Sequence, residues 1–118
     1  MGVNTGCSAD FWGALQNIPQ WPEDYSICDR VNHVFDVCIY KDNLNLLFAL
    51  NLPVPSTLTQ ELAVEGTAAL LNAAHPLVNY PLTEEEVIAI FQEAVETENY
   101  EEAISLFAAY NNLYCPLA

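Results

Sequence analysis

The sequence predicts an all-α protein, a single compact bundle of about five helices with a loop-rich, cysteine-containing N-terminal segment. Apolar residues recur at helical spacing along the second half of the chain, and helix-start signals precede them. No segment has the alternation, β-branching and turn spacing of a sheet. A chain of 118 residues that is 53% hydrophobic can bury one core, so we expect one domain over residues 1–118.

The first half of the chain predicts short helices separated by turns. Ser8 can cap a helix that continues to Ile18, and Pro19 and Pro22 then force a turn-rich segment. One or two helical turns are expected over residues 30–37.

Two helices are expected in the middle of the chain. The first begins at residue 42 or 43, ends at Leu50 and is stopped by Pro53 and Pro55. The second covers residues 59–74 and ends at His75-Pro76. Its packing face carries small and apolar residues: Leu62, Gly66, Ala69, Leu70 and Ala73.

The last third of the chain predicts a helical hairpin. Thr83 and Glu86 form a capping box, so a helix should begin there and continue to about Thr97. The run that begins at Asn99 repeats this start signal and predicts a second helix to residues 111–112. Because the connection is very short, the two helices should lie antiparallel.

The charge of the chain restricts its partners. Sixteen acidic residues against Arg30 and Lys41 give a formal net charge of -14. Nucleic-acid affinity comes largely from Lys and Arg, so we expect no nucleic-acid partner. Anionic membranes repel the same charge, and the most apolar run, residues 44–54, is too short to span a bilayer, so we expect no membrane insertion.

The chain has four cysteines, Cys7, Cys28, Cys38 and Cys115, an even number that is typical of disulfides in a small exported domain. Three pairings are open. We favour Cys28 with Cys38, which closes a short loop, and Cys7 with Cys115, which constrains the unfolded chain most. The rival interpretation is a zinc site built on Cys28, His33 and Cys38, but no close C-x2-C pair is present and we expect no metal.

Catalytic and calcium motifs are absent from the sequence. The only histidines are His33 and His75, and neither belongs to a hydrolase or metalloprotease motif, so we expect no enzyme and no cofactor. Asp36 and residues 42–45 offer oxygen ligands, but they break the EF-hand pattern. A weak surface calcium site is the most that these residues predict.

Aromatic residues crowd the N-terminal segment. They could form a sugar-stacking platform or a protein-contact patch, for which Trp21, Tyr25 and Trp12 are the candidate contact residues. The alternative is that they fill the open end of the helical core. We favour core positions for Phe11, Trp12 and Phe35, and exposure for Trp21.

The opening residues 6–12, GCSADFW, are similar to a G-C-T-P-G-[YF]-W motif, and residues 68–73 match the run AALLNA. On these motifs the chain resembles small domains of uncharacterised function found in many predicted secreted bacterial and fungal proteins. Further agreement, in chain order, comes from Trp21, Tyr25, Val34-Phe35, the run LLFAL, Tyr80-Pro81-Leu82-Thr83, Val87-Ile88, Asn112 and Cys115-Pro116-Leu117.

The resemblance implies export and disulfides but supplies no catalytic residues. Two stretches depart from the family pattern. Ser8-Ala9-Asp10 replaces Thr-Pro-Gly, and Gly13-Ala14 stands where the family commonly has Lys-Asn. Any function that depends on that basic and amide pair is in doubt for this chain.

The sequence therefore favours a non-enzymatic, secreted structural or interaction module that associates with itself or with a protein partner, free or attached to a surface. A chain of this size that is 53% apolar can carry more hydrophobic surface than its core hides. The alternative is a carbohydrate- or calcium-binding adhesion module. A zinc-binding domain and a hydrolase have less support.

Overall fold

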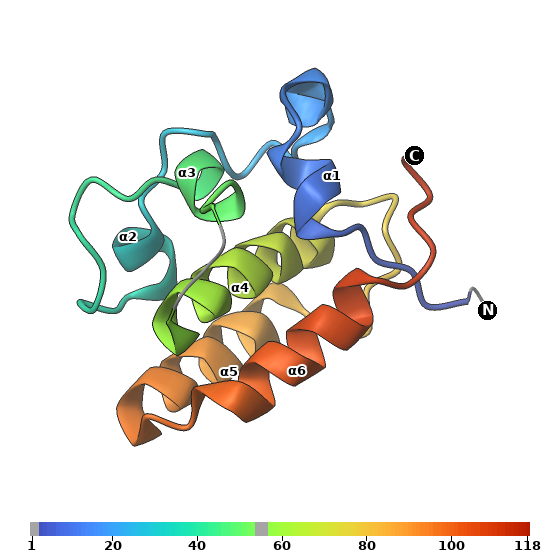
Figure 1. Ribbon diagram of the computed structural model, residues 1–118. Coiled ribbons are helices and arrows are strands. Elements are labelled where there is room, and N and C mark those ends of the chain that lie inside the picture. The colour runs from blue at the N-terminus through green and yellow to red at the C-terminus, as the bar shows by residue number, and fades with distance from the viewer. Residues whose placement is uncertain (1–2, 54–56) are drawn as a thin grey trace.

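A computed structural model describes residues 3–53 and 57–118, and every regular element within them is helical (Figure 1). The all-α prediction is thus confirmed for the described chain, whereas the count of about five helices is too low. The described residues form six α-helices and one 3-10 helix: α1 (Ala9–Gly13), η1 (Leu15–Gln20), α2 (Val31–Phe35), α3 (Leu46–Leu50), α4 (Leu58–Ala74), α5 (Glu84–Thr97) and α6 (Tyr100–Asn111).

The helix expected from Ser8 to Ile18 divides into α1 and η1. Ser8 caps α1 as predicted, because its side chain accepts a hydrogen bond from the amide of Phe11. The chain then turns extended at Ala14. Two side-chain amides donate hydrogen bonds to backbone carbonyls near the end of α1. Asn17 donates to the carbonyl of Phe11, and Asn51 donates to that of Gly13, each at 3.0 Å. These bonds satisfy the helix end without a further helical turn.

Helix α3 begins later than predicted, at Leu46 instead of residue 42 or 43. An isolated bridge between Arg30 and Asn45 holds the preceding backbone extended. Asn45 is therefore the N-cap, and its side chain accepts from the amide of Phe48 at 2.8 Å. Leu46, Ala49 and Leu50 are buried on the helix, whereas Phe48 points outward and is 65% exposed. Of the two prolines expected to stop this helix, Pro55 lies outside the described residues.

Helix α4 packs against α3, α5 and α6, which surround it (Figure 1). Gly66 makes the contact with the hairpin possible, since a Cβ there would lie only 2.6 Å from the Phe91 ring and 3.7 Å from that of Phe107. The small residue Gly66 on the predicted packing face of this helix therefore allows the aromatic rings of the hairpin to approach closely.

Helices α5 and α6 form the expected antiparallel hairpin (Figure 1). Thr83 and Glu86 make both bonds of the predicted capping box. The connection turns at Glu98, whose φ of 58° is left-handed. The second start signal works differently from the first: Asn99 makes no cap bond, and its side chain donates to Glu102 instead.

The core lies on both sides of α4. One cluster joins α2, α3, α5 and α6 and contains Phe35 stacked on Phe91, with ring centroids 3.8 Å apart. The other gathers Cys7 and Trp12 against α4. The radius of gyration is 12.9 Å, close to the ~13 Å of a compact chain of this size.

Candidate functional site

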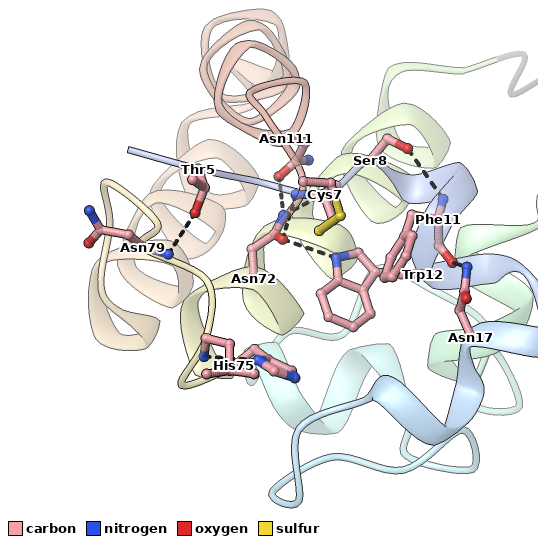
Figure 2. Close-up of a disulfide and its surroundings, with 12 residues drawn as sticks. Thr5, Cys7, Ser8, Phe11, Trp12, Asn17, Asn72, His75, Asn79 and Asn111 are labelled. Carbon is pink, nitrogen blue, oxygen red and sulfur yellow. Dashed lines mark hydrogen bonds between the residues drawn. A yellow bond between two sulfur atoms is a disulfide. The ribbon is translucent and has the colours of Figure 1, made fainter. Parts of the chain in front are cut away.

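The residues that carry the N-terminal and AALLNA motifs meet around one buried asparagine, Asn72 of α4 (Figure 2). Its Oδ1 accepts from the amide of Cys7 at 2.8 Å and from the indole Nε1 of Trp12 at 3.1 Å. Its Nδ2 donates to the carbonyl of Cys7 at 2.8 Å and to Oδ1 of Asn111 at 3.0 Å. The hydrogen-bonding capacity of the Asn72 amide is thus fully used within the fold.

Asn111, at the end of α6, extends this network and is also fully buried. Its Oδ1 also accepts from the hydroxyl of Tyr80 at 2.8 Å, and burial raises the pKa of that phenol. Its Nδ2 donates to the backbone carbonyl and to the carboxylate of Glu65, each at 3.0 Å. Every donor and acceptor of these two side-chain amides is bonded within the fold, so the two asparagines stabilise it.

The chain ends are fastened beside this network. The predicted disulfide between Cys7 and Cys115 is confirmed, and it joins residues that are 108 positions apart. Gly6 lies so close to the backbone of Tyr110 that an added Cβ would collide with that carbonyl oxygen. Gly6 is therefore explained by its close approach to Tyr110, and Cys7 by its disulfide with Cys115.

The other two cysteines, Cys28 and Cys38, are free and exposed, so the second expected disulfide is not formed. Helix α2 lies between them in the chain. His33 lies exposed on α2. Within residues 3–53 and 57–118 no group of three His, Cys, Asp or Glu side chains is arranged to hold a metal ion, so the zinc and calcium interpretations gain no support.

The three predicted contact residues do not form an exposed platform. Trp12 is fully buried, as favoured for a core residue, so its assignment as a contact residue is wrong. Trp21 is only half-buried, and its Nε1 donates to the backbone carbonyl of Trp12 at 3.0 Å. The hydroxyl of Tyr25 donates to Glu84 at 2.8 Å; burial and this contact raise its pKa. The polar groups of all three side chains are hydrogen-bonded within the fold.

His75 ends α4, as predicted, and is half-buried. Its Nδ1 accepts from the amide of Leu77 at 3.1 Å, and its ring centroid lies 6.0 Å from that of Trp12 (Figure 2). Burial lowers the pKa of this imidazole, against a smaller opposing effect from the backbone of Gln20. The neutral ring therefore accepts a hydrogen bond from the backbone just after the end of α4.

The strongest candidate for a functional surface is a groove of about 370 Å³ beside α3, which we call the Phe48 groove. Phe48 is 65% exposed and Ile39 is 40% exposed. The hydroxyl of Tyr40 donates to the carbonyl of Thr59 at 2.7 Å, which fixes this ring in the wall. The groove is lined by five apolar or aromatic residues and five polar ones: Ile39, Tyr40, Leu44, Phe48 and Leu52, with Lys41, Asn43, Thr57, Thr59 and Gln60.

The sequence contained a signal for this groove that depends on the register of α3. Once Asn45 is taken as the N-cap, Leu46, Ala49 and Leu50 share the inward face, and Phe48 is left facing outward. Without that cap the run LLFAL indicates only a buried helix. Asn72 likewise stood out as the one polar residue in the apolar run AALLNA.

Comparison of the chain with protein-family models, with curated proteins and with solved structures finds no match. Among the described residues, no helix is long and apolar enough to cross a membrane.

Proposed function

We propose that this chain is a non-catalytic, extracellular structural module that associates with copies of itself through the Phe48 groove. The observation that carries the proposal is the exposure of Phe48 beside Ile39, in a groove that Tyr40, Leu44 and Leu52 also line. Exposed aromatic rings next to apolar recesses are typical centres of protein contacts.

A second copy suits this surface because the same patch supplies a protruding ring and a recess. Two copies related by a two-fold axis would each place Phe48 against the groove of the other, as a self-complementary interface requires. Lys41, one of the two basic residues of the chain, lines the groove and reduces the local negative charge.

Extracellular location is supported by the Cys7–Cys115 disulfide, because such bonds persist in oxidising compartments. The family resemblance noted above points the same way. The carbohydrate-binding alternative loses its main support, since Trp12 is buried and the polar groups of Trp21 and Tyr25 are already bonded.

Charge makes the proposal sharply testable. Each copy carries a formal charge of -14, so copies repel one another at low salt. Between about 0.01 M and about 1 M salt, the Debye length falls from about 30 Å to about 3 Å. Association driven by the apolar groove should therefore strengthen as salt is added.

Sedimentation velocity over a range of protein concentrations, at both salt levels, tests the proposal. We expect oligomers at high salt that are lost in Phe48→Ser and kept in Leu15→Ser, a matched change at a residue that is 71% exposed but lies outside the groove. A monomer under every condition, or equal loss in both variants, would contradict self-association through this groove.

A further inference from the structure

A second groove, of about 490 Å³, lies between α5 and α6 near the turn that joins them, and we call it the hairpin groove. It is separate from the Phe48 groove in residues and in charge. Its lining is mixed: four residues are apolar, two are neutral and polar, and two are acidic, namely Ile90, Ala94, Ala103 and Leu106, then Thr97 and Asn99, then Glu93 and Glu102.

Helical spacing places the hairpin groove on a face that α4 does not occupy. Gly66 of α4 packs against Phe91 and Phe107, so the core sides of both hairpin helices are already filled. Ile90 is about 100° around α5 from Phe91, and Leu106 is about 100° around α6 from Phe107. Helices α5 and α6 lie side by side (Figure 1). The groove is lined by residues of both helices.

Small side chains leave the floor of the groove open. Ala94 and Ala103 are 4% and 5% exposed and contribute only methyl groups, while Ile90 and Leu106 are half-buried. Such a floor has space for apolar side chains that project from a partner.

The rim carries uncompensated negative charge. Thr97 directs its hydroxyl to the backbone carbonyl of Glu93, and the carboxylate of Glu102 receives one bond, at 3.3 Å, from the neutral amide of Asn99. Neither carboxylate has a cationic partner within the described chain. One carboxylate stands on each helix, so the two flank the apolar floor.

We propose that the hairpin groove binds a cationic amphipathic segment of a partner protein. Apolar side chains of that segment would lie on the alanine floor, and its Lys or Arg side chains would pair with Glu93 and Glu102. Charge complementarity selects this occupant over a second copy, which has only Arg30 and Lys41 to offer and carries a formal charge of -14.

The test uses fluorescence anisotropy with a labelled helical peptide that has leucine on one face and lysine on the other. Two reference peptides separate the contributions, one with glutamate in place of lysine and one with serine in place of leucine. We expect binding of the Leu/Lys peptide only, because the apolar and the cationic faces are both required.

Protein variants locate the binding surface. Glu93→Gln with Glu102→Gln should weaken binding by at least about fivefold, the effect expected for the loss of two surface ion pairs. The matched control is Glu96→Gln with Glu101→Gln, which removes the same charge from exposed positions on the same helices outside the groove, and should change the affinity by less than about twofold.

Three results would overturn the proposal: no binding of the Leu/Lys peptide, equally tight binding of the Ser/Lys peptide, or equal weakening in both pairs of variants. The last two would indicate diffuse attraction between a cation and an acidic protein. The Phe48→Ser variant should still bind the peptide, so failure of self-association and failure of this proposal are told apart.

Discussion

The side chains of Asn72 and Asn111 bond to each other at 3.0 Å, although 39 positions separate them in the chain and both are fully buried. Through this bond α4 is connected to the end of α6, and through Asn72 both are connected to Cys7. A polar link in a core of this size fixes how the helices meet, because each misplaced helix would leave buried donors without acceptors.

Asn72→Asp should destabilise the protein by about 3 kcal/mol or more. The change keeps an acceptor for Cys7 and Trp12, but it removes both donor bonds and buries a charge next to Oδ1 of Asn111. Denaturant unfolding measures the loss. Asn112→Asp, one residue along from Asn111 and exposed, is the control and should cost less than about 1 kcal/mol; equal losses would contradict a role for the network.

Thr67→Val should stabilise the protein by about 1 kcal/mol. Among the described residues, the Thr67 hydroxyl is the one buried side-chain oxygen or nitrogen without a hydrogen-bond partner, and valine keeps its shape while removing the unpaired group. Thermal unfolding detects the change. Thr97→Val loses a hydroxyl bond to Glu93 and should give no gain; a lower melting temperature for Thr67→Val would show that the hydroxyl has a partner.

Gly66→Ala should destabilise the protein, although alanine is favoured over glycine inside a helix by about 1 kcal/mol. The added Cβ would lie 2.6 Å from the ring of Phe91, which is itself stacked on Phe35 and cannot move freely. A double-mutant cycle separates the two effects. In a Phe91→Ala background the same change should become neutral or stabilising, and a loss that persists there would place its cause elsewhere.

Alkylation without reductant should add two labels, on Cys28 and Cys38, and four after reduction and unfolding. Intact mass gives the count directly, and no label on the native protein would show that these two thiols are paired.

Replacing Cys7 and Cys115 by serine should cost up to about 4.7 kcal/mol, the chain-entropy value for a loop of about 100 residues.

His75 should make stability fall as the pH is lowered. Its pKa is depressed in the folded chain, so the unfolded chain binds more protons below its ordinary value of about 6.5. The stability that the neutral ring contributes is present above about pH 6.5 and is lost as the pH falls through that value towards the folded pKa. Protonation also removes the acceptor for the amide of Leu77.

Unfolding measured at about pH 7.5 and about pH 5 tests this titration. The difference in unfolding free energy between wild type and His75→Asn should change between these two pH values. A pH-independent difference for His75→Asn would contradict the titration.

The long helices were predictable from sequence because their signals are local. The capping box at Thr83 and the apolar spacing of residues 87–95 need no distant partner to be effective. The ends of the short helices were less predictable, although the Ser8 cap of α1 was expected. Their ends are set by side-chain amides such as Asn45 and Asn51, which compete with the backbone from outside the helix.

Candidate surfaces were harder to predict than helices because they depend on long-range contacts. A core position was favoured for Trp12, but its bond to Asn72, 60 positions away, is one that no local pattern reveals. The Phe48 groove brings together residues from the α2–α3 loop, α3 and the start of α4. Composition predicted excess apolar surface, and only the fold determines where that surface lies.

The Cys7–Cys115 bond also determines how the module would respond to mechanical load. Tension applied to the two ends of the chain passes through one covalent bond and bypasses the chain between two cysteines that are 108 positions apart. The helices between them would therefore carry little of the pull and could not unravel to lengthen the chain. In a series of such modules under strain, each unit would behave as an inextensible bead while the disulfide is intact, and would become extensible once it is reduced.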